Sequence, residues 1–376
     1  MKIPILRIPF TDEEISFINN KIKEILKSGQ LAMGKNVKEF EGRFARFCRT
    51  KFCIGTNNGT SALEIALRCF DVKNKSVIVP TNTFMATIFA PVHAGAKVIF
   101  TDVTKEDLSI DPNDLNEKIQ KDTKAVILVH IGGIISFHLK EIMKICKDND
   151  VLLLEDAAHA HGATFDGKMA GSFGDVAAFS FYPTKVMTCG EGGAITTDNL
   201  EIDKWARIWR NEGKSDTNLN VHPIFGNNWR LSEIHAVIAL SQLNKIDWIL
   251  SKRRKIAGWY DEKLKNVSGI KLITIPDNIK SSYYKYIVYL GKDIERSKIK
   301  KELKERFNIS LTGEVYEFPC HTQPVFKKYP QMKLNKDNEK FPMSEYVCNR
   351  QICLPLYPGL SEKEVDYVVE SFKEVL

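Results

Sequence analysis

Long apolar runs and closely spaced cysteines are both absent from this chain of 376 residues. No run reaches the roughly 18 consecutive apolar residues that cross a bilayer, so we expect no transmembrane helix. Residues 1–10 lack the apolar core and cleavage site of a secretory signal, which predicts a cytoplasmic protein. The eight cysteines have no C-x-x-C spacing, so they indicate reduced thiols and exclude a metal site of that kind.

The excess of basic residues is modest, with a formal net charge of +7. Basic and acidic side chains alternate along residues 300–306, which is typical of a solvated helix face. The dense cluster at residues 251–255 follows a predicted helix over 231–249. We therefore expect no nucleic-acid partner.

The middle of the chain alternates short apolar strands with helical segments, from about residue 52 to residue 200. Strands that are apolar throughout predict an α/β fold whose mostly parallel sheet is covered on both faces. Capping boxes begin helices after Thr11 and after Ser361. We expect a large domain over residues 1–250 and a smaller C-terminal α/β domain over 251–376.

Two chemically complementary residues follow strands of this sheet. Lys185 lies between an apolar strand and a glycine-rich loop, and Asp156 ends the strand that begins at Val151. Ligands bind beyond the carboxyl ends of parallel strands, so both side chains are expected at one edge. A lysine that forms a Schiff base and an acid that holds a pyridine nitrogen protonated are what a pyridoxal phosphate enzyme requires. The pair predicts catalytic roles for Lys185 and Asp156.

The segment from Gly55 to Leu63 leads from a strand into a helix. Its glycines allow close approach of the backbone, and the amides at a helix N-terminus attract phosphate. An Asn-Gly turn into a capped helix has the same appearance, so this segment alone does not decide between the two.

Other candidates near the pair also have structural explanations. Asp156 could cap a helix that starts at Ala157 instead of binding a cofactor. His159 could contact the cofactor ring or be a core histidine, and Phe84 could stack on the ring or belong to the core. We interpret Cys189 as a small loop residue.

Four motifs occur in order along the chain. They are Asn-Gly-Thr-Ser-Ala-Leu at 58–63, Glu-Asp-Ala-Ala-His-Ala at 155–160, residues 180–185 with Gly-Glu-Gly-Gly at 190–193, and Gly-Asn-Asn-Trp-Arg at 226–230. Together they resemble the DegT/DnrJ/EryC1/StrS family of pyridoxal phosphate-dependent sugar aminotransferases. The similarity continues through Leu-Pro-Leu-Tyr-Pro at 354–358, near the C-terminus.

The resemblance implies an aspartate aminotransferase-like fold (fold type I) and a homodimer with active sites at its interface. It implies that Lys185 carries the Schiff base, that Asp156 pairs with the pyridine nitrogen, and that His159 lies near the cofactor hydroxyl. The remaining implied cofactor residues are Asn58, Gly59, Thr60 and Ser180 around the phosphate, Phe84 on the ring, and Asn228 from the other subunit.

The family likeness further implies the conversion of a keto sugar, expected to be nucleotide-linked, into an amino sugar. Glutamate is the expected donor, and pyridoxamine phosphate (PMP) is the form of the cofactor between the two half-reactions. Transamination of a keto-cyclitol or of a small phosphorylated ketone is an alternative, and so is a catalytically silent regulatory protein that binds the cofactor.

Substrate identity is expected to depend on loops near residues 182, 211–228 and 313–323. Tyr182 and Glu212 stand where many family members have histidine, and Lys35 replaces a common proline. The candidate substrate residues are Tyr182, Glu314, Tyr316 and His321.

Overall fold

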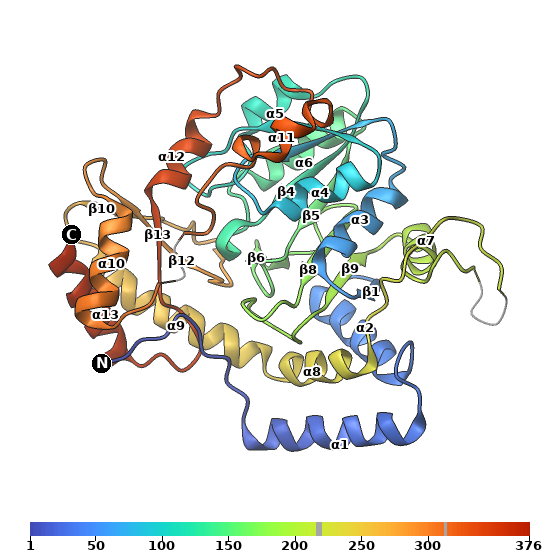
Figure 1. Cartoon of the computed structure of the whole chain (residues 1–376), viewed down its shortest axis with the longest axis horizontal. Coiled ribbons are helices and arrows are strands. Elements are labelled where there is room, and N and C mark those ends of the chain that lie inside the picture. The colour runs from blue at the N-terminus through green and yellow to red at the C-terminus, as the bar shows by residue number, and fades with distance from the viewer. Residues whose placement is uncertain (216–219, 312–313) are drawn as a thin grey trace.

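The computed structural model describes residues 1–215, 220–311 and 314–376, so parts of two of the three predicted substrate loops (216–219 and 313) lie outside the described residues. The described residues contain a large sheet in the order β1-β9-β8-β5-β4-β2-β3 (Figure 1). From β3 to β8 neighbouring strands are parallel, and β9 is antiparallel to both of its neighbours. The predicted mostly parallel sheet is confirmed. Its strands are β1 (Phe52–Thr56), β2 (Ser76–Pro80), β3 (Lys97–Thr101), β4 (Thr123–Val129), β5 (Leu152–Asp156), β8 (Val176–Ser180) and β9 (Gly193–Thr197).

Helices cover both faces of this sheet, and a separate apolar core lies on each side. On one side α2, α6 and α8 contribute Phe40, Ile142 and Leu240 to the core. On the other side α3 and α4 contribute Leu63 and Ile88. Burial on both faces explains why the strands are apolar throughout. The helices are α2 (Lys35–Cys48), α3 (Gly59–Cys69), α4 (Met85–His93), α5 (Pro112–Lys118), α6 (Leu139–Asp148), α7 (Leu200–Arg210) and α8 (Glu233–Asn244).

A smaller antiparallel sheet, in the order β10-β12-β13, lies in the C-terminal part of the chain. One face packs with α9, α10 and α13 around Tyr260, Leu303 and Phe372. The other face joins the core of the large sheet through Ile287 and Cys353. The C-terminal core supports our proposal of a second domain after residue 250. These elements are α9 (Ile246–Leu264), β10 (Ile270–Leu272), β12 (Tyr286–Leu290), α10 (Arg296–Phe307), β13 (Gln351–Leu354) and α13 (Glu362–Val375).

The helix expected over residues 231–249 is interrupted, and this prediction was wrong in length. Two helices, α8 and α9, meet at Lys245, whose backbone (φ −113°, ψ 13°) is not helical. The side chain of Lys245 donates to the carbonyl of Pro9 and forms an ion pair of 2.6 Å with Glu14, which ties this break to the N-terminal segment. The predicted capping boxes are both present, at the starts of α1 (Asp12–Ser28) and α13. Within the described ranges, no helix is long and apolar enough to cross a membrane.

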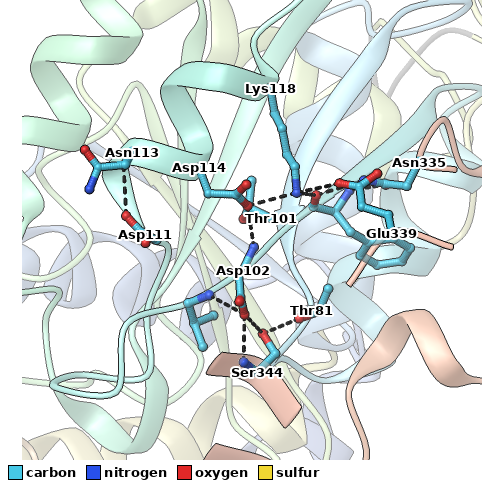
Figure 2. Close-up of polar contacts among 12 residues, drawn as sticks. Thr81, Thr101, Asp102, Asp111, Asn113, Asp114, Lys118, Asn335, Glu339 and Ser344 are labelled. Carbon is cyan, nitrogen blue, oxygen red and sulfur yellow. Dashed lines mark hydrogen bonds and ion pairs between the residues drawn. The ribbon is translucent and has the colours of Figure 1, made fainter. Parts of the chain in front are cut away.

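β3 is an edge strand of the large sheet, and residues 334–335, in the segment before α12, cover its free edge. Leu334 donates its amide to Val98 (2.9 Å), and the Asn335 side chain exchanges two hydrogen bonds with the backbone of Phe100 (Figure 2). Covering an edge strand removes a surface that could pair with other chains. The remaining short elements are η1 (Ile131–Gly133), β6 (Thr164–Phe165), β7 (Lys168–Met169), β11 (Ile279–Lys280), η2 (Cys320–Thr322), α11 (Val325–Lys328), η3 (Pro330–Met332) and α12 (Pro342–Arg350).

Asp102, just beyond β3, caps the N-terminus of α12, although the two are far apart in the sequence. Its carboxylate accepts hydrogen bonds from the amides of Met343 (2.9 Å) and Ser344 (2.7 Å) and from the Ser344 hydroxyl (Figure 2). The residue before the helix, Phe341, has no side chain that could do this. The first amides of a helix have no partner within it, so a carboxylate at this end is stabilising.

We predict that Asp102→Ala lowers the free energy of unfolding by about 1–3 kcal/mol, because the N-terminus of α12 loses its cap. Chemical denaturation measures this change. Asp337→Ala is the matched control, since Asp337 lies in the same segment with a 91% exposed side chain, and it should change stability by less than about 0.5 kcal/mol. Equal effects of the two substitutions would contradict the prediction.

Candidate active site

A cavity of about 560 Å³ lies where the carboxyl ends of β5 and β8 meet the start of α3. Residues far apart in the sequence therefore share one space, as expected for ligand sites in parallel sheets. Eight of the predicted cofactor residues line it: Asn58, Gly59, Thr60, Phe84, Asp156, His159, Ser180 and Lys185.

Lys185 is a half-buried cation that lines this cavity. Burial lowers the pKa of its amine, the charge of Asp156 raises it and the charge of Lys285 lowers it, with a net value of about 8. Its Nζ lies 4.9 Å from the centre of the Tyr284 ring. A lysine whose pKa is close to neutral can act both as a nucleophile and as a base.

Asp156 ends β5 and is buried, with 6% of its surface exposed. Burial raises the pKa of its carboxyl, whereas the Thr87 hydroxyl bond, the Ala158 amide bond and the charges of Lys185 and His130 lower it. The hydroxyl of Thr87 donates to Oδ2 at 2.8 Å, and the amide of Ala158 donates to Oδ1 at 3.2 Å. No helix starts at Ala157, so the alternative interpretation of Asp156 as a helix cap was wrong.

The turn between β1 and α3 forms one wall. Asn58 caps α3, because its side-chain oxygen accepts the amide of Ser61 at 2.8 Å. The capped-helix interpretation therefore applies to this side chain, while the helix N-terminus still opens on the cavity at Gly59 and Thr60. A Cβ atom on Gly59 would lie 2.8 Å from Cβ of Ser180, so this position requires glycine for the close approach of β8.

His159 lies between two tyrosines. Its ring stacks on Tyr284 with centroids 4.2 Å apart, and its Nε2 lies 3.4 Å from the hydroxyl of Tyr316. The amide of Gly132 donates to Nδ1, which must therefore be the unprotonated nitrogen. Burial holds the pKa of His159 well below its usual range, so the ring is neutral with its proton on Nε2.

Two aromatic side chains that line the cavity are exposed to solvent. Phe84 is 62% exposed and Tyr182 is 48% exposed, and both line the cavity. Such exposure excludes the alternative in which Phe84 is a core residue. Tyr316 also lines the cavity, with its ring 6.3 Å from that of Phe84.

Three predicted site residues lie away from this cavity. Asn228 is exposed, three residues after the fully exposed Phe225 (99%). Glu314 forms ion pairs with Arg296 (2.6 Å) and Lys300 (3.0 Å) on α10. His321 packs against the ring of Phe341, with centroids 4.6 Å apart, near the edge of β3.

Sequence reasoning missed three residues at the site. Thr87 binds Asp156, the Tyr284 hydroxyl lies 3.0 Å from that of Thr184, and Lys285 places its Nζ 5.1 Å from the Tyr284 ring centre. The spacing of four between Thr83 and Thr87 was the one available signal, because it puts both hydroxyls on one face of a helix. Tyr284 and Lys285 reach Lys185 only through the packing of the smaller sheet.

Comparison with known proteins agrees with this geometry. The profile of the DegT/DnrJ/EryC1/StrS aminotransferase family matches residues 12–373. The chain is 36% identical to the dTDP-3-amino-3,6-dideoxy-alpha-D-galactopyranose transaminase of Aneurinibacillus thermoaerophilus, over 97% of this chain and 98% of that protein. It is 32% identical to the GDP-perosamine synthase of Caulobacter vibrioides, over 92% of this chain and 91% of that protein.

A solved structure with the same fold is NtdA from Bacillus subtilis with bound cofactor PMP. The TM-score is 0.89 at 27% identity, over 100% of this chain and 85% of that one. The fold type expected from the sequence is thereby confirmed. With a family match across nearly its whole length, the chain belongs to the DegT/DnrJ/EryC1/StrS aminotransferase family.

Proposed function

We propose that this protein is a pyridoxal phosphate-dependent aminotransferase that converts a nucleotide-linked keto sugar into an amino sugar, with glutamate as the amino donor. The observation that carries the proposal is the shared cavity of Lys185 and Asp156 at the N-terminus of α3. Relatives named for dTDP- and GDP-linked amino sugars support the substrate class. They differ in nucleotide, so both nucleotides belong in the test.

The residues of the cavity fit this cofactor. The amides of Gly59 and Thr60 open the helix, where they have no partners within it and suit a phosphate. Phe84 offers an exposed aromatic face for the ring, and the Asp156 carboxylate is held by two donors with lone pairs to spare for a pyridine nitrogen. When bound, the cofactor supplies an aldehyde that takes up amino groups and a ring that withdraws electrons.

Lys185 acts in both half-reactions as the acid and base. Its amine moves the proton between the α carbon of the donor and the C4′ carbon of the cofactor, and it reverses this transfer when the keto sugar is aminated. A pKa of about 8 leaves both protonation states populated near neutral pH.

The assembly we propose is a homodimer in the cytoplasm. The exposed Phe225 and Asn228 support it, because a fully exposed aromatic ring favours an interface. Asn228 would then reach the cofactor phosphate of the other subunit. Tyr182 and Tyr316 line the cavity and are the substrate contacts that the geometry supports, whereas Glu314 and His321 remain predictions made from the sequence alone.

Purified protein loaded with the cofactor tests the function. We expect glutamate to abolish the visible absorption of the lysine-bound cofactor, and a dTDP- or GDP-linked keto sugar to restore it with release of an amino sugar. Restoration by keto-cyclitols or small phosphorylated ketones alone would place the enzyme in those classes. No response to any donor would indicate a silent regulatory protein.

Replacement of the catalytic lysine should remove activity without unfolding the chain. We predict that Lys185→Ala lowers kcat by about 10²–10⁴-fold or more, because proton transfer loses its acid and base. Product analysis by mass spectrometry measures the rate. Lys301→Ala, on the exposed face of α10, is the control and should keep full activity. Full turnover by Lys185→Ala would refute the assignment.

Lys285 should tune the proton affinity of Lys185. Removing a nearby positive charge makes the protonated amine less unfavourable, so Lys285→Met should raise the pKa of Lys185 above about 8. The covalent uptake of cofactor by the apo-protein requires the neutral amine, and its rate should therefore move to higher pH. Absorbance recorded across a pH series measures this shift.

Two further variants control for this pH experiment. Lys285→Arg keeps the charge and should keep the wild-type pH dependence, while Lys280→Met removes an exposed lysine of β11 and should have no effect. A pH midpoint that stays in place or falls in Lys285→Met would exclude the electrostatic role of Lys285.

A further inference from the structure

A chain of two hydroxyl groups ends at the Asp156 carboxylate. The Thr87 hydroxyl lies 2.8 Å from Asp156 Oδ2, and the Thr83 hydroxyl lies 2.7 Å from that of Thr87. All three residues are buried, with exposed fractions of 6% for Asp156, 0% for Thr87 and 2% for Thr83. Buried polar groups are nearly always hydrogen-bonded, and these two hydroxyls meet that need through each other and the carboxylate.

The direction of these hydrogen bonds follows from proton counting. An ionised carboxylate can only accept, so Thr87 must give its single hydroxyl proton to Asp156. Thr87 then has no proton left for Thr83, and Thr83 must be the donor between the two hydroxyls. With Asp156 ionised, the chain of donated protons therefore runs from Thr83 through Thr87 to Asp156.

The segment that enters α4 also carries an aromatic side chain of the cavity. Phe84 is the N-cap of α4 and faces the cavity, while Thr83 and Thr87 lie on the buried side. Cys320 fixes this segment from η2, because its thiol lies 3.0 Å from the carbonyl of Thr83 and its amide donates to Thr81 at 2.7 Å. One segment therefore carries both the ring-stacking residue and the support of the carboxylate.

We propose that Thr87 is a positioning residue that holds Asp156 ionised and oriented toward the cofactor's pyridine nitrogen, with Thr83 orienting the Thr87 hydroxyl. This inference rests on the proposed role of Asp156. Without the hydroxyl, Asp156 retains a proton more strongly and shares it less with the pyridine nitrogen. The ring then withdraws fewer electrons, and removal of the donor's α proton becomes slower.

The test compares Thr87→Val, which removes the hydroxyl at nearly constant shape, with Thr87→Ser, which restores it. Holoenzyme loaded with cofactor labelled with ¹⁵N in the ring reports protonation of the pyridine nitrogen by its NMR chemical shift. In Thr87→Val we expect this shift to move toward the unprotonated value and α-proton removal to slow by about 10–100-fold, as for other supporting hydrogen bonds. Thr87→Ser should stay within about threefold of the wild type in rate.

Thr83→Val is a second variant that tests the same hydrogen-bond chain if Thr87→Val does not fold. It leaves Thr87 free to rotate, and it should give a change of the same sign but smaller size in both measurements. A wild-type nitrogen shift and rate in the folded valine variants would overturn the inference. Asp156→Asn separates the two proposals: if it also leaves the nitrogen shift unchanged, the assignment of Asp156 itself fails.

Discussion

Burial of the Asp156 carboxylate is the constraint on which the rest of the site depends. A charge at the end of an apolar strand is costly unless donors and a counter-charge surround it. Here the donors are the Thr87 hydroxyl and the Ala158 amide, and the counter-charge is Lys185. Each of these groups is fixed by a different segment, so the position of the carboxylate constrains the β5 end, the first turn of α4 and the loop after β8 together.

The C-terminal segments complete the site rather than forming a separate body beside it. The ring of Tyr284 contacts both His159 and Lys185, and the Cys320 thiol bonds to the carbonyl of Thr83. The Asp102 cap attaches the start of α12 to the large sheet, and Leu334, in the segment before α12, is hydrogen-bonded to β3. Loss of these attachments would loosen the cavity wall without touching a reacting atom.

The sequence was sufficient for the elements whose signals are local. Apolar strands, the capping boxes at Thr11 and Ser361, and the pairing of Lys185 with Asp156 at one sheet edge depend on neighbouring residues or on the rules of parallel sheets. The break at Lys245 was missed because its cause is a contact with the N-terminal segment more than two hundred residues earlier. Tyr284 and Lys285 were missed for the same reason, since the packing of the smaller sheet decides what they touch.

Burial shifts the pKa values of Asp156 and Lys185 in opposite directions, because it disfavours the charged form of each. This explains how the Lys185 amine becomes available in its neutral form. Burial raises the pKa of Asp156 and lowers that of Lys185, which settles at about 8. The Asp156 ion is favoured by the Thr87 hydroxyl, the Ala158 amide and then the charge of Lys185, whereas the Lys185 ion is favoured by the charge of Asp156. A ligand that presents a protonated ring nitrogen to Asp156 takes over the role of counter-charge. Lys185 then loses the partner that favours its proton, while Lys285 continues to oppose it. Binding of such a ligand thus lowers the pKa of the Lys185 amine further and leaves more of it unprotonated, which is the form that acts as a nucleophile.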